Sequence, residues 1–169
     1  MFIVIRIKFM TKINNNFKEN KNLRNVLGKF STGVTVVTTK NKQNTPIGIT
    51  VNSFSSVSLD PPLISWCLGK EQPSHKDFVN ANGFAVNILS KKQLDICNRF
   101  ANPCIDKFKK FSYKTSNEGY PIISDSLAVI TCKTWSIYPG GDHDIFVGKV
   151  IEFNSTNEHP LIFWNGKLS

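Results

Sequence analysis

Residues 48–63 read Gly48-Ile-Thr-Val-Asn-Ser-Phe-Ser-Ser-Val-Ser-Leu-Asp-Pro-Pro-Leu63, an alternating strand that runs into a turn rich in hydroxyl groups. Apolar side chains fall on one face of the expected strand, and Gly48, Thr50 and Asn52 fall on the other. Such a strand can bury its apolar face and hold a flat polar ligand on its polar face. The serines of the turn can hydrogen-bond anionic oxygens through their hydroxyl and backbone N–H groups. The stretch by itself also fits an ordinary half-buried strand closed by a serine-rich turn.

Other segments of the chain have the length of strands, together with alternation, β-branched composition or a short apolar run. With Ile47–Ser53 they are Val34–Thr39, Leu63–Leu68, Phe84–Leu89, Leu127–Tyr138, Ile145–Phe153 and Pro160–Trp164. Several short strands in one domain favour an antiparallel barrel over a parallel sheet. The sequence has neither the strand–helix alternation nor the G-x-G-x-x-G motif of a Rossmann domain.

Short helices are expected between these strands. Apolar residues at helical spacing predict one amphipathic helix over residues 23–30. Ser74 can N-cap a second helix that continues to Ala81, with Asp77 as a capping-box-like acid. Ser90 can cap a third helix. The buried stripe of that helix is expected to be Leu94, Cys97 and Phe100 or Ala101. Residues 103–121 are polar and irregular, which is typical of a mobile loop near a site.

Composition places the chain among soluble globular proteins of one domain, since its 169 residues are 40% hydrophobic and 20% charged. The formal net charge of +9 is unevenly distributed. Residues 1–30 hold seven basic side chains and one acidic side chain, whereas residues 31–169 hold fourteen and eleven. The nearly balanced charge of the larger part argues against a nucleic-acid-binding or membrane-binding protein.

The first residues are expected to form a basic, disordered leader over residues 1–22, ahead of one domain over 23–169. The apolar run Met1–Phe9 is shorter than the ~20 residues of a membrane span. No small-residue cleavage site follows it, so a cytoplasmic location is expected. Met10 is an alternative start. No ferredoxin or oxygenase module is expected.

The cysteines form no CxxC pair, and the histidines complete no metal-ligand spacing, so no metal site is predicted. Free and mostly buried thiols are expected at Cys67, Cys97, Cys104 and Cys132. The tryptophans are expected to pack in the core rather than to stack on a cofactor. They are Trp66, Trp135 and Trp164.

Two motifs flank residues 48–63: Phe30-Ser-Thr-Gly-Val-Thr-Val-Val-Thr38 upstream and Pro139-Gly-Gly-Asp-His-Asp-Ile-Phe-Val-Gly-Lys-Val150 downstream. With the three motifs in this order, the chain from about Leu23 to Lys167 resembles the flavin reductase family. Members are FMN-binding split barrels that often supply reduced flavin to two-component monooxygenases. The resemblance implies a mainly β fold, an antiparallel split β-barrel of Greek-key type with a few short flanking helices. Residues 91–114 match only weakly, so flavin and dinucleotide preference stay open.

The resemblance also implies that FMN, or FAD, lies against residues 48–56. Similar proteins contact the isoalloxazine edge through backbone groups, which suits a rigid strand. The positions that match these contacts are Ile49, Thr50, Val51 and Asn52. Ser55 and Ser56 match positions near the ribityl–phosphate tail. Cys67, on the next apolar strand, is a further expected contact.

Three polar residues elsewhere are candidate cofactor contacts. Ser74 and His75 resemble the hydroxyl and basic group at a family helix start, where free N–H groups and the helix dipole favour a phosphate. They could equally be a plain N-cap and a surface histidine. Asn87 is a polar residue in an apolar strand, so its amide either binds ligand or ties strands together.

His143 is the candidate catalytic residue. In Gly140-Gly-Asp-His-Asp144 the glycines allow a tight turn that can bring the backbone close to a ligand. The family carries this histidine on the nicotinamide side of the flavin pocket. Because hydride passes directly from nicotinamide to flavin, His143 would orient the dinucleotide or stabilise charge rather than act as a base.

These expectations describe an NADH- or NADPH-dependent flavin reductase that acts as a homodimer and supplies a monooxygenase component. An FMN-binding or electron-transfer protein of the same fold, without catalysis, is the alternative. A nucleic-acid-binding barrel that uses the basic leader is a weaker one.

Overall fold

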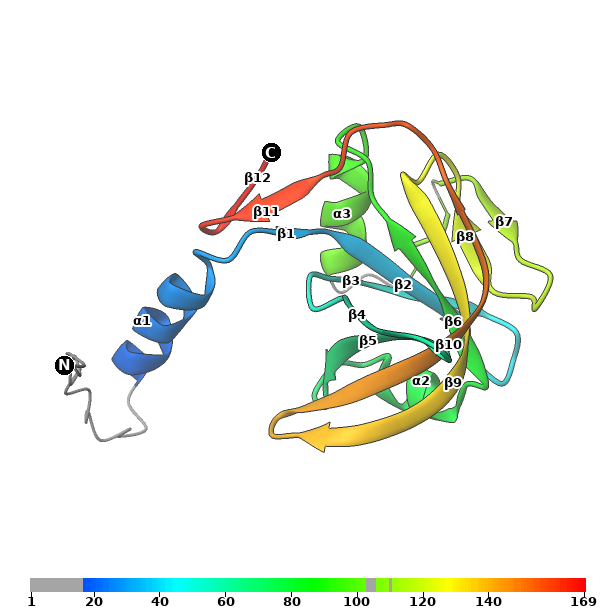
Figure 1. Cartoon of the computed structure of the whole chain (residues 1–169), viewed down its shortest axis with the longest axis horizontal. Coiled ribbons are helices and arrows are strands. Elements are labelled where there is room, and N and C mark those ends of the chain that lie inside the picture. The colour runs from blue at the N-terminus through cyan, green and yellow to red at the C-terminus, as the bar shows by residue number, and fades with distance from the viewer. Residues whose placement is uncertain (1–16, 103–105, 110) are drawn as a thin grey trace, which may run out of the picture.

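The computed structural model describes residues 17–102, 106–109 and 111–169 (Figure 1). The described helices are α1 (Phe17–Leu27), α2 (His75–Asn80) and α3 (Leu94–Ala101). The described strands are β1 (Thr32–Gly33), β2 (Thr35–Lys40), β3 (Pro46–Val51), β4 (Ser55–Leu59), β5 (Pro62–Gly69), β6 (Gly83–Ile88), β7 (Tyr113–Thr115), β8 (Pro121–Ile123), β9 (Ala128–Gly140), β10 (His143–Ser155), β11 (Ile162–Trp164) and β12 (Lys167–Leu168).

One antiparallel sheet of seven strands, in the order β3-β2-β6-β9-β10-β5-β4, makes up the body of the protein. Its two edge strands, β3 and β4, are consecutive in the chain and are joined by only residues 52–54. The sheet therefore has to curl until its edges approach each other, yet the described strands form no ladder between β3 and β4. This open barrel confirms the predicted mainly β, antiparallel class.

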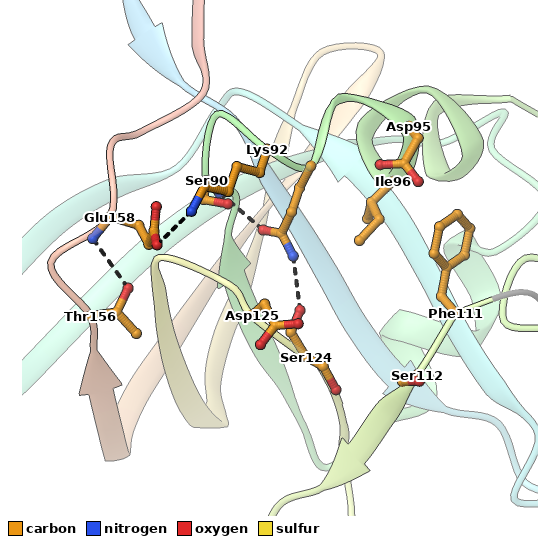
Figure 2. Close-up of a pocket in the computed structure, with 11 residues that line it drawn as sticks. Ser90, Lys92, Asp95, Ile96, Phe111, Ser112, Ser124, Asp125, Thr156 and Glu158 are labelled. Atoms are coloured by element: carbon orange, nitrogen blue, oxygen red, sulfur yellow. Dashed lines mark hydrogen bonds and ion pairs between the residues drawn. The ribbon is translucent and has the colours of Figure 1, made fainter.

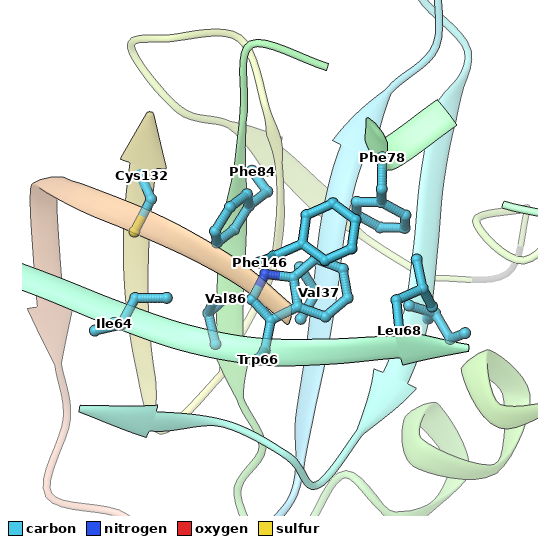
Figure 3. Packing of buried hydrophobic residues seen from close by; sticks show 10 residues of the cluster. Val37, Ile64, Trp66, Leu68, Phe78, Phe84, Val86, Cys132 and Phe146 are labelled. Atoms are coloured by element: carbon cyan, nitrogen blue, oxygen red, sulfur yellow. The ribbon is translucent and has the colours of Figure 1, made fainter. Parts of the chain in front are cut away.

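The barrel interior is filled by an aromatic cluster around Trp66 (Figure 3). The Trp66 ring stacks on Phe146 with 4.6 Å between centroids, and it meets Phe78 and Phe84 edge-on at 5.0 and 5.5 Å. These side chains come from β5, β10, α2 and β6, so one cluster fixes both halves of the sheet to α2. Aromatic pairs at such distances add to the stabilisation that burial of their apolar area already gives.

A second cluster lies between the sheet and α3. Its buried members are Val34, Val36, Leu89, Ile96, Cys97, Phe100, Phe108, Ile123 and Leu161. The prediction that Leu94 points inward was wrong: it is 45% exposed, and Ile96 takes its place. The helix begins at Leu94 with Gln93 at the N-cap position, three residues after the predicted cap Ser90. Ser90 instead donates its backbone N–H to the Gln93 side chain.

Several other predictions needed correction. The serine-rich turn contains a strand, β4, and the polar segment 103–121 contains β7 and the buried Phe108. Trp135 and Trp164 are 52% and 53% exposed, so only Trp66 of the tryptophans is in the core. The first helix ends at Leu27 rather than Phe30 and includes residues 17–22, which the sequence assigned to the leader. Residues 1–16 of that leader lie outside the described residues.

The cysteine prediction holds for the part of the chain that the structure describes. Cys97 and Cys132 are buried, Cys67 is half-buried, and all three are free thiols. Cys104 lies outside the described residues. No described helix has both the length and the apolar character that crossing a membrane requires.

Candidate functional site

The outer edge of β3 is the first element of the candidate site. β2 pairs with β3 on one side only, so the opposite edge of β3 carries no strand among the described residues. The Gly48 carbonyl faces this edge, because it accepts a hydrogen bond from Lys107 Nζ at 3.2 Å. In an antiparallel strand successive residues direct their N–H and C=O groups to opposite edges. The backbone of Thr50 therefore shares the open edge, whereas that of Ile49 and Val51 faces β2.

The side chains of β3 are less available than the sequence suggested. Ile49 is buried in the aromatic cluster, as its alternation predicts, and Val51 packs against the same cluster. On the other face a Cβ at Gly48 would lie 2.5 Å from the Phe100 ring, and Thr50 donates its hydroxyl to the Cys97 carbonyl at 2.8 Å. That face is thus packed against α3 at these two positions.

The loop after β3 is fastened to β5 by a single serine. Ser53 Oγ accepts a hydrogen bond from the Cys67 backbone N–H at 2.9 Å and donates to the Cys67 carbonyl at 3.2 Å. Asn52 beside it is exposed. Burial raises the pKa of the Cys67 thiol, and the hydrogen bond with Ser53 opposes that rise. Cys67 is therefore a neutral, half-buried group next to the loop, which suits contact with an uncharged ring.

Ser55 and Ser56 lie on β4, at the far edge of the sheet, and both are exposed. They pair with Ser65 and Ile64 of β5. Ser55 donates its hydroxyl to the carbonyl of its neighbour Ser56 at 3.1 Å, and this hydrogen bond is weak and exposed to solvent. The two serines follow the Asn52–Phe54 loop directly, which keeps the predicted ring and tail contacts in one continuous segment.

His143 is the first residue of β10, at the tip of the β9–β10 hairpin, and its side chain is 48% exposed. Its Nδ1 lies 2.7 Å from Asp142 Oδ1, a contact that lowers the pKa of the Asp142 carboxyl. Register places His143 opposite Gly69 of β5. A Cβ at Gly69 would lie 3.6 Å from His143 Nε2. Because Gly69 has no side chain, the imidazole meets no β5 side chain at the position opposite it.

The turn into α2 is connected to the same hairpin. His75 Nε2 lies 2.8 Å from Asp144 Oδ2, and each side chain is 16% exposed. The Nε2 atom of His75, a predicted phosphate contact, is therefore already paired with a protein carboxylate. Ser74 occupies the N-cap position as predicted, but its side chain makes no capping hydrogen bond. Its hydroxyl therefore has the freedom to serve a ligand.

Asn87 has hydrogen-bond partners within the protein for both ends of its amide. Its side chain is fully buried, and Nδ2 donates to the Val36 carbonyl at 2.9 Å and to Thr38 Oγ1 at 3.1 Å. Oδ1 accepts the Ile123 backbone N–H at 2.8 Å. All the amide's principal bonds are thus made to β2 and β8, so the residue ties strands together.

A cavity of about 680 Å³ opens beside β3 and the α2 turn. It is lined by Gly48 of β3, Ser74 of the turn, Phe108 and neighbouring residues. A second cavity, of about 610 Å³, lies at the start of α3 (Figure 2) and includes none of the predicted site residues. The described residues contain no group of three or more metal-ligating side chains.

Sequence reasoning missed four residues that shape the site: Ser53, Gly69, Lys70 and Asp144. The motif of residues 139–150 contains Asp144, but its partner His75 is 69 residues away. Lys70 and Gly69 follow an apolar strand and carry no periodic signal. The β5–β10 register places Gly69 opposite His143, and the hydrogen bonds of Lys70 to Gly141 and Asp142 place Lys70 at the same turn.

Comparison with known proteins agrees with this geometry. Residues 27–169 match the family model described as flavin reductase like domain. An FMN reductase (NADH) from Agrobacterium fabrum is 40% identical over 149 residues, which are 88% of this chain and 84% of that protein. The crystal structure of the Streptomyces globisporus NADH:FAD oxidoreductase in complex with NAD and FAD fragments has a TM-score of 0.86 at 36% identity, covering 91% of this chain and 93% of the other.

Some relatives are much longer than this chain. The reductase component of the flavin-dependent trigonelline monooxygenase of Acinetobacter baylyi is 40% identical over 146 residues, 86% of this chain but 47% of that protein. A relative from Rhizobium meliloti is covered over 46% of its length. The chain thus spans about half the length of these two curated relatives. Since the family model covers residues 27–169 and the fold is shared at full barrel length, the chain belongs to the flavin reductase like domain family.

Proposed function

We propose that the protein is an NADH- or NADPH-dependent flavin reductase that takes FMN or FAD. One observation carries the proposal: the open edge of β3, the Asn52 loop and His143 adjoin one another along β5. Ser53 ties the loop to Cys67, and Gly69, opposite His143, is two residues further along the strand. Two residues of strand span about 7 Å, which is roughly the shorter dimension of a flavin ring system.

The groups at this place fit a flavin. The ring edge of a flavin carries carbonyl oxygens and nitrogens, and the open backbone edge at Thr50 and Asn52 offers matching donors and acceptors. Cys67 offers a neutral surface beside them. Ser55, Ser56 and Ser74 offer hydroxyl groups for an anionic tail, whereas Ile49, Val51 and Asn87 are already engaged within the protein. Bound flavin would supply the hydride acceptor, which no side chain of the chain can provide.

His143 would act on the dinucleotide side. Its imidazole is half exposed, is held through Nδ1 by Asp142, and leaves Nε2 above the bare Gly69. In that place it can orient a nicotinamide amide group or stabilise negative charge that develops nearby. Relatives named FMN reductase (NADH) and NADH:FAD oxidoreductase support this pairing of substrates.

The activity is tested by following NADH and NADPH oxidation with FMN, FAD and riboflavin in turn. We expect oxidation that depends on added or bound flavin. Failure with every combination would refute the proposal. If the protein binds flavin but the flavin is not reduced on addition of either dinucleotide, the non-catalytic electron-transfer protein would be the correct reading.

We also propose a homodimer. Several large apolar side chains are exposed on α1, on β4 and on the β9–β10 hairpin, a pattern typical of protein interfaces. The most exposed are Val26, Leu27, Phe30, Leu59 and Phe153, at 68%, 63%, 78%, 93% and 78%. A second copy would cover this surface. Sedimentation velocity should give twice the mass of the chain, and a species of 19.0 kDa at micromolar concentration would contradict the dimer.

Delivery of reduced flavin to a monooxygenase component is the proposed use of the activity. Several relatives are named as reductase components or subunits of flavin-dependent monooxygenases. Such use requires that reduced flavin leave the protein more readily than oxidised flavin. Anaerobic titrations should therefore give a larger dissociation constant for reduced than for oxidised FMN. We place the flavin-binding domain at residues 23–169, so a variant beginning at Leu23 should keep flavin binding.

A further inference from the structure

We propose that Lys70 and Asp144 are positioning residues that clamp the tip of the β9–β10 hairpin and thereby hold His143 in place for hydride transfer. The inference rests on the proposed function, because it assumes that His143 acts on the dinucleotide.

Lys70 fastens the turn through both its backbone and its side chain. Its backbone N–H donates to the Asp142 carbonyl at 3.0 Å, and its Nζ donates to the Gly141 carbonyl at 2.7 Å. Two successive carbonyls of the turn are thus held by one residue at the end of β5. Gly141 has a φ of +75°, a conformation that other residues rarely adopt. The turn therefore has one specific backbone conformation, which the bonds from Lys70 can maintain.

Asp144 extends the clamp to α2. Its Oδ1 lies 3.6 Å from Lys70 Nζ, and its Oδ2 lies 2.8 Å from His75 Nε2. The Asp144 and His75 side chains are each 16% exposed, so solvent screens this pair less than a surface ion pair. One carboxylate therefore joins the end of β5, the base of the hairpin tip and the first residue of α2.

Lys70 contacts the residue before His143 and the residue after it. Asp142 and Asp144 are the immediate neighbours of His143, and both are bound to Lys70, one through its carbonyl and the other through its carboxylate. Asp144 pairs with Leu68 on the adjoining strand and points away from the face that His143 shares with Gly69. Small displacements of a positioned group are costly, since an error of about 1 Å can reduce a rate about 100-fold.

A direct role of the Lys70 ammonium on the dinucleotide phosphates is the competing explanation. The ammonium is already bound to the Gly141 carbonyl and lies near the Asp144 carboxylate, which favours the clamp. The two explanations predict different behaviour when His143 is absent. A residue that acts through His143 loses its effect in that background, whereas a direct phosphate contact keeps it.

The experiment compares four variants of the FMN-loaded full chain: Lys70→Met, Asp144→Asn, His143→Ala and the double variant Lys70→Met/His143→Ala. Lys92→Met is the matched control, because its Nζ makes a 2.8 Å ion pair with Glu158 at the other cavity. Stopped-flow absorbance gives the rate of flavin reduction by saturating NADH or NADPH. Amide hydrogen exchange at Asp142 and His143 reports the order of the tip without any need for activity.

We expect Lys70→Met and Asp144→Asn to slow flavin reduction about 10- to 100-fold and to speed exchange at the tip, with Lys92→Met unchanged. In the His143→Ala background, Lys70→Met should not lower the rate of flavin reduction any further. Additive losses, an unchanged rate, or unchanged exchange would each overturn the clamp. If Lys70→Met does not fold, Lys70→Gln together with Asp144→Asn makes the same comparison.

The outcome also separates the clamp from the function on which it rests. If flavin in the unmodified protein is not reduced by either dinucleotide, the proposed function fails, while the exchange measurement still decides whether Lys70 holds the tip. If His143→Ala is slow and Lys70→Met is fast, the function stands and the clamp fails.

Discussion

His75 Nε2 lies 2.8 Å from Asp144 Oδ2 and so connects the first residue of α2 with the hairpin that carries His143. These two segments were expected to serve opposite ends of a bound flavin, the phosphate and the reacting ring. The contact between His75 and Asp144 shows that the start of α2 and the β9–β10 hairpin are joined directly in the fold. It also gives the His75 imidazole a partner within the protein, whereas the Ser74 hydroxyl makes no capping hydrogen bond and is the polar group of that turn that could meet a phosphate.

The hydrogen bonds of Asn87 predict a residue that matters for stability and not for ligand binding. Asn87→Ala removes three bonds and leaves buried partners unsatisfied, so we expect a loss of about 2–3 kcal/mol in the free energy of unfolding. FMN affinity of the folded variant should not change. Urea unfolding and a flavin titration measure the two quantities. Asn102→Ala, which removes one exposed hydrogen bond, is the control. Weaker FMN binding at unchanged stability would restore Asn87 as a ligand contact.

Gly48 predicts a second stability effect. A Cβ at this position would lie 2.5 and 2.7 Å from two atoms of the Phe100 ring, which is fully buried and cannot move aside. Gly48→Ala should therefore cost about 1–3 kcal/mol. At Gly33, another strand glycine, a Cβ would meet nothing within 4 Å, and Gly33→Ala should cost nothing. Thermal unfolding of the two variants measures the difference. Equal melting temperatures would mean that the Phe100 ring of α3 does not pack closely enough on β3 to exclude a Cβ at position 48.

Alternation, β-branched composition and short apolar runs together predicted most of the barrel, since half-buried strands repeat every two residues and fully buried strands read as continuous apolar runs. β2, β3, β5, β6, β9 and β10 all lie where the pattern placed them, within a few residues at their ends. β4 escaped notice because its serines carry no apolar pattern. Trp135 and Trp164 were placed in the core wrongly, since alternation identifies two faces of a strand but not which face is covered.

The site was predictable only where one continuous segment builds it. Asn52, Ser55, Ser56 and His143 could be chosen from motifs, and the structure brings both segments to β5. The roles of Asn87 and His75 were ambiguous in the sequence. A buried polar residue requires hydrogen-bond partners, but the sequence does not show whether they are protein groups or a ligand. Lys70 and Asp144 are 74 positions apart, and strand register alone makes them neighbours.

The buried thiol of Cys132 predicts a loss of stability in alkali. Burial raises its pKa from 9.0 to about 12, so between these values the native state keeps a proton that the unfolded chain has released. The stabilising contribution is complete below pH 9 and is lost as the pH rises toward 12, by at most about 1.4 kcal/mol per pH unit. Urea unfolding across this range should show a steeper decline for the unmodified protein than for Cys132→Ala. Val86→Ala, which opens a space in the same cluster without removing an ionisable group, is the control. Parallel curves for all three proteins would contradict the prediction.

His143 allows the chemical and the structural roles of one residue to be told apart. Its side chain is half exposed and bonds only to the exposed Asp142 among the described side chains, so His143→Ala should leave the melting temperature and FMN affinity nearly unchanged. The rate of flavin reduction should fall ~10- to 100-fold, as expected if one contact worth about 1.4–2.7 kcal/mol in the transition state is removed. Stopped-flow reduction of the FMN-loaded variant gives this rate directly, and His159→Ala, another exposed histidine, is the control. If stability and flavin binding fall together while the rate per bound flavin is normal, His143 supports the hairpin and takes no part in hydride transfer.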